Sequence, residues 1–289
     1  MKVLINVRNI ESNIKKAQEL VSVPVSLMFK EFYEDILPHI DLSCMKEGGE
    51  IFATHAEGSV CFSIGKYNWH HKGALVTNQE DALECLAKNI RLIYIPVNAE
   101  DDREGLSVST ANYLSRLIRA KDRFITIKAM VTSGCLNDKH PTFEQLDEIW
   151  NKLQCFDGMS LGGSFWLPFG LLPKYVTDVR IGEYMLFGTI PYSEDKYLQG
   201  KNGIEIEAKI IGVYPERSEF IVDCGYSHAD MDKCKHMVPY DIEYVDSSSE
   251  YTIFKSDVSH ITIGDTLTFI PNYKSLVKLR NAEHRLFTT

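Results

Sequence analysis

The sequence predicts an α/β fold, a (β/α)8 TIM-like barrel followed by a C-terminal all-β domain. Up to about residue 190, short apolar runs alternate with amphipathic stretches of helical period, which is typical of a barrel of parallel strands. Beyond that point, strand patterns follow one another with turn residues between them and no helical pattern. The length of 289 residues is sufficient for a barrel with an appended domain.

The first predicted elements are a strand, a helix and a second strand. Residues 1–8 alternate between apolar and polar side chains, and Ile10 and Ile14 then recur at helical spacing. The segment 23–29, VPVSLMF, is a continuous apolar run, typical of a parallel strand that is buried on both faces. This run ends at Lys30, so the lysine directly follows the first strand of the predicted barrel.

The remaining barrel elements continue the alternation. Asn78 is expected to cap one helix, and Thr110 is expected to begin another. Thr142 and Gln145 have the spacing of a capping box at the start of a third. The other strands are expected at residues 51–55, 60–64, 73–77, 91–97, 123–132, 156–160 and 176–180.

The change of pattern predicts two domains. Residues 1–195 are expected to form the barrel and residues 204–289 the β domain, with the linker in the segment 191–203. The strand at residues 1–8 is expected to pack on the β domain rather than in the barrel.

Composition excludes several classes of protein. The net charge is −9, and no basic face is visible, which argues against nucleic-acid binding. No run approaches the ~20 apolar residues of a membrane helix. The N-terminus lacks the basic start and apolar core of a signal peptide, so a cytoplasmic protein is expected. The seven cysteines are scattered without a Cys-x-x-Cys pair, which indicates reduced thiols.

Two kinds of feature could carry chemistry: a lysine that could form an imine with an aldehyde, and glycine motifs that could bind an anion. A lysine at the end of a barrel strand points into the mouth of the barrel, and Lys30 could form an imine there; a solvated lysine is the alternative. Gly163 and Ser164 in SLGGSFWLPFG could supply backbone N–H groups and a hydroxyl to an anion, or form an ordinary turn. The backbone N–H groups of Gly182 and Glu183 in VRIGEYMLFG could also bind an anion, as at the N-terminus of a helix. Phosphate sites of barrels often follow the last two strands, where both motifs fall.

The order of these motifs resembles the alanine racemase superfamily, the fold type III enzymes that depend on pyridoxal 5'-phosphate (PLP). Within it the chain is most similar to the alanine/ornithine racemase branch. The resemblance covers nearly the whole chain, and the Arg-x-Gly segment with the preceding Gly-Gly-Ser is its most specific part. The matching segments are INVRNIESNI (5–14), LMFKEFY (27–33), DDREGL (101–106), MVTSGC (130–135), LGGSFWLP (161–168), VRIGEYMLFG (179–188), VDCGYSHADMD (222–232) and IGDTLTFIPNY (263–273).

The resemblance implies a cofactor site. Lys30 would hold PLP as an internal aldimine. Ser164, Gly182 and Glu183, the last two through their backbone, would bind the phosphate together with Gly163. Arg180 would face the pyridine nitrogen. Because an arginine does not readily give up its proton, the ring nitrogen would stay unprotonated, which favours a racemase over a decarboxylase.

The resemblance also implies a substrate site shared between two subunits. Arg103 would lie near the substrate carboxylate, although its acidic surroundings are equally typical of a solvated loop. Tyr226 would enter the active site of the partner in a head-to-tail homodimer, although a tyrosine in a β domain is often a core residue. Lys30 and Tyr226 would then exchange the α-proton on opposite faces, and a small or basic amino acid would be racemised.

The chain departs from the family pattern at several positions. Tyr33 is expected to bind the phosphate, but it follows the lysine by three residues instead of four. Phe287 stands where a second phosphate-binding tyrosine is expected, and Tyr273 is a candidate to replace it. The Met-Asp motif of alanine racemases is replaced near Ser248. These departures leave open which amino acid is the substrate and whether the racemase activity is retained.

Other functions remain as alternatives. Another PLP enzyme of this fold, such as a decarboxylase, aldolase or dehydratase, is one, and a non-catalytic PLP-binding protein is another. Acidic residues of the β domain could receive a basic substrate or form a solvated face. These residues are Asp241, Glu243, Asp246 and Glu250. No metal site is expected, because the spacing of Cys224, His228, Cys234 and His236 is not that of a zinc site.

Overall fold

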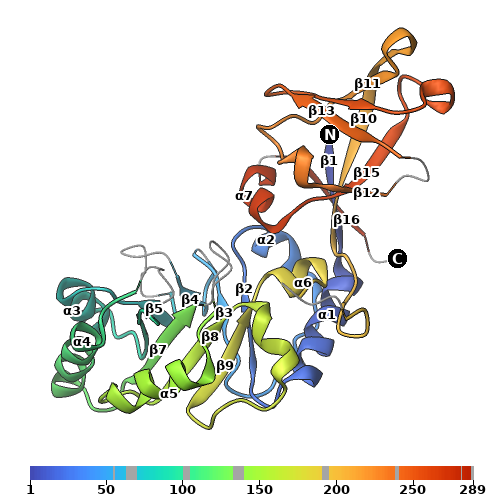
Figure 1. The fold of residues 1–289 in the computed structure, drawn as a ribbon. Helices are drawn as coiled ribbons and strands as arrows, with labels where there is room; N and C mark the ends of the chain where they lie inside the picture. The colour runs from blue at the N-terminus through green and yellow to red at the C-terminus, as the bar shows by residue number, and fades with distance from the viewer. Residues whose placement is uncertain are drawn as a thin grey trace.

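The computed structural model describes residues 1–54, 56–62, 70–99, 105–132, 140–190, 195–237, 241–280 and 282–287. It contains a closed barrel and a separate, mainly antiparallel sheet, which lie side by side in Figure 1. The predicted fold class, a parallel barrel followed by a C-terminal β domain, is confirmed.

Eight parallel strands close the barrel in the order β2 to β9, and β2 pairs with β9. Each strand overlaps the segment predicted for it. Phe52, Leu75, Leu92 and Tyr94 are buried in one cluster, which is expected of a barrel whose interior is packed rather than open. The strands are β2 (Val25–Met28), β3 (Ile51–Phe52), β4 (Val60–Cys61), β5 (Gly73–Leu75), β6 (Leu92–Pro96), β7 (Thr126–Thr132), β8 (Gly158–Gly162) and β9 (Val176–Ile181).

The barrel helices begin close to where the capping residues predicted. Asn78 accepts a hydrogen bond from the Asp81 backbone, and Thr142 forms the expected capping box with Gln145. The expectation for Thr110 was wrong, because the Ser107 side chain caps that helix and Thr110 is its hydrogen-bond donor. The helices are α1 (Val7–Leu20), α2 (Tyr33–Ile36), α3 (Gln79–Ala87), α4 (Val108–Lys121), α5 (Phe143–Lys152) and α6 (Glu183–Phe187). None of the helices in the described segments could span a membrane.

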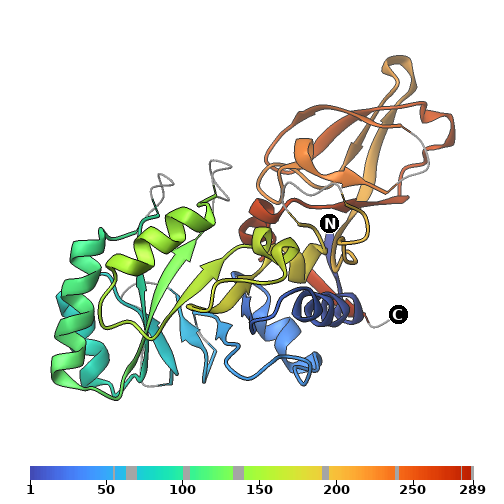
Figure 2. The ribbon, with the colours of Figure 1, turned by 60° about the horizontal axis from the view of Figure 1, so that its bottom comes forward.

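The second sheet has the order β12-β15-β10-β11-β14-β13. The N-terminal strand β1 (Lys2–Asn6) also belongs to it, because β1 pairs antiparallel with β10 and parallel with β16. The chain then enters the barrel through α1, as the dark blue helix in Figure 2 shows. The other strands are β10 (Ile204–Tyr214), β11 (Glu219–Val222), β12 (Lys235–His236), β13 (Glu243–Ser247), β14 (Thr252–Lys255), β15 (Thr266–Ile270) and β16 (Glu283–Phe287).

A short helical segment of the β domain lies beside the barrel (Figure 1). It consists of the 3-10 helix η6 (Tyr273–Ser275) and helix α7 (Leu276–Leu279). Leu276 and Leu279 are completely buried, and Arg280 makes an ion pair of 3.8 Å with Glu31, next to Lys30. This segment therefore brings β-domain side chains to the end of strand β2.

Candidate active site

Lys30 lies at the C-terminal end of the first barrel strand. The Phe29 backbone N–H still donates to the Phe52 carbonyl at 2.9 Å, so the strand stays paired up to the residue before the lysine. The Lys30 side chain is exposed, and its Nζ lies 4.7 Å from the centre of the Tyr273 ring. Phe32 follows with a left-handed backbone (φ 62°), which is energetically unfavourable for a bulky residue. The burial of its side chain helps to maintain this conformation.

The two glycine motifs meet at the ends of strands β8 and β9. The Gly163 N–H donates to the Arg180 carbonyl at 2.9 Å, and Gly163 has the positive φ of 108° that favours glycine. Ser164 is buried, and its Oγ accepts a hydrogen bond of 3.0 Å from the Tyr184 backbone N–H. This bond occupies an acceptor lone pair of the hydroxyl, so the Ser164 proton can be donated to an anion.

Tyr273 closes this region from the side of the β domain. A Cβ atom on Gly182 would overlap the Tyr273 hydroxyl oxygen and would come within 3.1 Å of the Met28 carbonyl oxygen. The Tyr273 ring packs edge-on against Phe187, and its face lies under the Lys30 ammonium. The hydroxyl therefore lies against the Gly182 backbone. We call Gly163, Ser164, Gly182 and Tyr273 the anion cradle.

Glu183 brings a partly buried carboxyl group close to the lysine. Thr189 donates a hydrogen bond of 3.1 Å to Glu183 Oε1. Burial raises the pKa of Glu183, and the Thr189 hydrogen bond and the positive charge of Lys30 partly oppose this. The side chain thus lies within the electrostatic reach of Lys30, while the Glu183 backbone begins α6 beside the anion cradle.

Arg180 is held inside the barrel by a chain of polar groups. Its Nη1 donates to the Ser160 hydroxyl at 2.7 Å, and Ser160 donates to the Asp178 carboxylate at 2.6 Å. Lys128 and Ser26 donate to the same carboxylate, each at 2.9 Å. Asp178 can only accept and Arg180 can only donate, so the direction of each bond is fixed.

Sequence reasoning did not find Asp178, Ser160 or Lys128. One signal was present, because Asp178 and Arg180 are two residues apart on one strand and therefore face the same side. The partners come from other strands, which no local pattern connects.

The other predicted site residues do not join the cradle within this chain. The Tyr33 hydroxyl donates to Glu34 at 2.8 Å, whereas the Tyr273 hydroxyl lies against Gly182. Tyr226 lies in the β domain with 56% of its surface exposed. Phe287 ends strand β16 in register with Asn6, and Arg103 lies outside the described residues.

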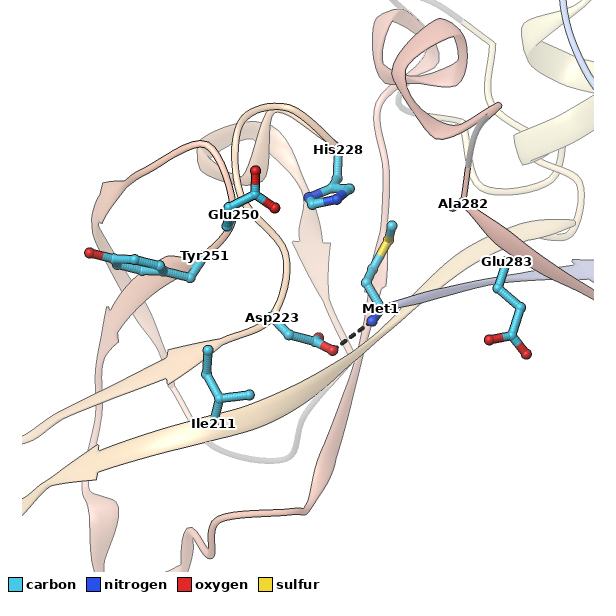
Figure 3. Close-up of a pocket in the computed structure, with 8 residues that line it drawn as sticks. All are labelled: Met1, Ile211, Asp223, His228, Glu250, Tyr251, Ala282 and Glu283. Atoms are coloured by element: carbon cyan, nitrogen blue, oxygen red, sulfur yellow. Dashed lines mark hydrogen bonds and ion pairs between the residues drawn. The ribbon is translucent and has the colours of Figure 1, made fainter.

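A hollow of about 490 Å³ lies in the β domain, away from the cradle. Figure 3 shows the Met1 ammonium group joined to Asp223, with His228 and Glu250 nearby; the ion pair measures 2.6 Å. Burial raises the pKa of the neighbouring Cys224 thiol to about 12. Among the described residues no group of three or more His, Cys, Asp or Glu side chains could hold a metal ion.

No protein-family model matches the sequence. A curated relative, the D-serine dehydratase of Dictyostelium discoideum, is 28% identical over 131 residues, which are 38% of this chain and 33% of that protein. The chain therefore matches about a third of that relative's length.

Solved structures of three kinds of enzyme resemble the whole chain. The alanine racemase of Corynebacterium glutamicum superposes with a TM-score of 0.71 at 13% identity, covering 99% of both chains. The D-threo-3-hydroxyaspartate dehydratase of Delftia sp. HT23 gives 0.68 at 13% identity, covering 99% of this chain and 94% of the other. The D-threonine aldolase of Filomicrobium marinum gives 0.72 at 10% identity, covering 98% and 88%. The chain thus has the two-domain fold of alanine racemase, which the dehydratase and the aldolase share.

Proposed function

We propose that this protein binds PLP through Lys30 and racemises a small or basic amino acid. The observation that carries the proposal is the placement of Lys30 over the Tyr273 ring of the anion cradle, at the C-terminal ends of strands β2, β8 and β9. A phosphorylated aldehyde needs an amine to condense with and hydrogen-bond donors for its phosphate, and this region offers both.

The described residues fit the cofactor. The Ser164 hydroxyl keeps a proton to donate, and the Tyr273 hydroxyl lies against Gly182, where a side chain would exclude it. Together with the backbone N–H groups of Gly182 and Glu183, they would bind the phosphate. Arg180 has its guanidinium group fixed by Ser160 and would face the pyridine nitrogen. When bound, PLP supplies an electron sink that acidifies the α-proton of an amino acid.

Racemisation then needs two proton carriers on opposite faces of the substrate. Lys30 is one, and Tyr226 of the partner subunit is the other. The exposure of Tyr226 and its location in the β domain support its delivery to a second barrel in a head-to-tail homodimer.

Arg103 is proposed to bind the substrate carboxylate. We further propose residues 1–195 and 204–289 as the two domains, with strand β1 packed in the sheet of the second domain, and a cytoplasmic location.

A dehydratase acting on D-amino acids is the second candidate function. The match to a D-serine dehydratase and the fold shared with a D-threo-3-hydroxyaspartate dehydratase favour it. Such an enzyme would release ammonia and a keto acid from a β-hydroxy amino acid, whereas a racemase would return the same amino acid with the opposite configuration.

One set of assays separates the two functions. The protein loaded with PLP is incubated with L-alanine, L-ornithine or L-lysine, and the products are resolved by chiral chromatography. Parallel reactions contain D-serine or D-threo-3-hydroxyaspartate. Each is run with and without EDTA, which removes metal ions. We expect D-enantiomers from the first set and no keto acid from the second. Keto acid release, above all if EDTA abolishes it, together with no change of configuration would contradict the racemase proposal.

Gly182→Ala tests the cradle directly. The added methyl group meets the Tyr273 hydroxyl, so we expect a loss of about 1–3 kcal/mol in stability and PLP binding at least about tenfold weaker. The double variant Gly182→Ala/Tyr273→Phe removes the overlapping oxygen. It should regain part of the stability, measured by thermal unfolding, but not the affinity, because the hydroxyl is itself a phosphate donor. Normal PLP affinity in Gly182→Ala would exclude this cradle as the phosphate site.

A further inference from the structure

One short segment of the β domain contains Tyr273 and contacts Tyr226, the two tyrosines with proposed functions. The segment runs from Tyr273 in η6 to Lys278 in α7. At its start, Tyr273 lies under Lys30 and against Gly182. At its end, Lys278 Nζ donates a hydrogen bond of 3.1 Å to the Tyr226 carbonyl oxygen. Within one subunit, only a few residues of one helical segment therefore separate the anion cradle from Tyr226. Tyr226 is the tyrosine proposed to act in the active site of the other subunit.

The segment also holds the far end of the loop that carries Tyr226. The Asp230 backbone N–H donates to Ser275 Oγ at 3.1 Å, and Ser275 is completely buried. Lys278 donates to the Asp230 carboxylate as well, and this bond lowers the pKa of Asp230. Asp230 therefore stays ionised at neutral pH, and hydrogen bonds between charged groups are stronger than neutral ones. Lys278 thus ties residues 226 and 230 together.

The remaining contacts of this loop come from within the β domain. The Tyr226 and Ser227 N–H groups donate to the carbonyls of Ser248 and Ser249 at 2.9 and 3.2 Å. These bonds fix the amide side of the loop. Lys278 instead binds the carbonyl oxygen of Tyr226. It belongs to the segment from Tyr273 to Lys278, which contacts the barrel.

We propose that Lys278 is a positioning residue for Tyr226, and that the segment from Tyr273 to Lys278 couples the cradle of one subunit to the tyrosine offered to the other. The inference rests on the proposed function. A phosphate held by the Tyr273 hydroxyl restrains η6, and η6 continues directly into α7. Lys278 then restrains the Tyr226 carbonyl and Asp230 together, so a filled cradle leaves the loop less free to open.

Hydrogen–deuterium exchange measures this coupling without any turnover. In the wild-type protein, PLP is expected to slow exchange of the amides at residues 226–230. Lys278→Met keeps the aliphatic stem but removes the donor, so basal exchange should rise about tenfold and the response to PLP should disappear. Lys278→Arg retains a donor and should preserve most of the protection. Lys274→Met is the matched control, because Lys274 is an exposed lysine of the same segment. Equal loop exchange in Lys278→Met and Lys274→Met would overturn the proposal.

Kinetics provide the second readout. If Lys278 acts through Tyr226, Lys278→Met slows the exchange of the α-proton with solvent for the same enantiomer that Tyr226→Phe slows, and leaves the other enantiomer near wild type. Adding Lys278→Met to Tyr226→Phe should then cause no further loss in the rate of α-proton exchange. Equal slowing of both enantiomers, or additive losses, would indicate a general structural role instead.

The two proposals can fail separately. If Lys278→Met loosens the loop but the wild-type protein racemises no amino acid, the proposed function is refuted and the positioning role of Lys278 remains. Racemisation with a loop that responds neither to PLP nor to Lys278→Met would refute the positioning role alone.

Discussion

Lys30→Ala is expected to produce a colourless protein that no longer retains PLP and has lost racemase activity by at least about 10³-fold. The reason is that Lys30 is both the proposed covalent anchor of the cofactor and one of the two proton carriers. Wild-type protein should be yellow, and borohydride should bleach it. The side chain is exposed, so folding should change by no more than about 0.5 kcal/mol. Absorbance spectra and a racemisation assay on matched preparations measure both effects.

Lys174→Ala is a suitable control for this variant. Lys174 is also exposed, but it precedes strand β9 and so lies at the opposite end of the barrel from Lys30. It should keep the yellow colour and full activity. A Lys30→Ala protein that remained yellow after gel filtration and still turned over would show that another group holds the cofactor.

Tyr226→Phe is expected to lower racemisation by about 10²–10⁴-fold while leaving PLP binding and the melting temperature unchanged. Phenylalanine has no proton to give or take, and a side chain that is 56% exposed contributes little to folding. Solvent exchange of the α-proton should persist for the enantiomer that Lys30 deprotonates. Full racemisation in both directions would remove Tyr226 from the mechanism.

Mixing two inactive variants tests whether Tyr226 acts in the partner's site. In a head-to-tail dimer, a hybrid of Lys30→Ala and Tyr226→Phe subunits has one site with both residues intact. After unfolding and refolding a one-to-one mixture, activity should return to about a quarter of wild type, because half of the dimers are hybrids and each has one working site. No recovery, despite hybrid dimers seen by native mass spectrometry, would place both residues in the same subunit's site or exclude Tyr226.

Much of the fold could be predicted because several barrel strands are rich in apolar residues and alternate with segments of helical pattern. Within the segment 23–29, successive residues 25–27 are buried, as expected of a parallel strand covered on both faces, so the apolar pattern shows both the strand and the place where Lys30 follows it. Helix starts followed from side chains that cap them locally, as at Thr142. Thr110 was misplaced because Ser107, three residues earlier, has the same capping chemistry.

The candidate site was only partly predictable, because much of it is built from contacts distant in sequence. Motif order indicated that Ser164 and Gly182 could bind one anion, and the structure joins them through Tyr184. The family resemblance suggested Tyr33 as the phosphate tyrosine despite its altered spacing, but only the folded β domain shows that Tyr273 reaches Gly182. The same holds for Lys278 and Tyr226, which are 52 residues apart and meet through packing of α7.

The most direct test of the central claim is to locate the cofactor's covalent attachment by mass spectrometry. PLP-loaded protein is reduced with borohydride, digested and sequenced by tandem fragmentation. We predict a single phosphopyridoxyl group, on the peptide that contains Lys30 and on that residue. A label on another lysine such as Lys128, or no retained label in a protein that binds PLP, would contradict the account.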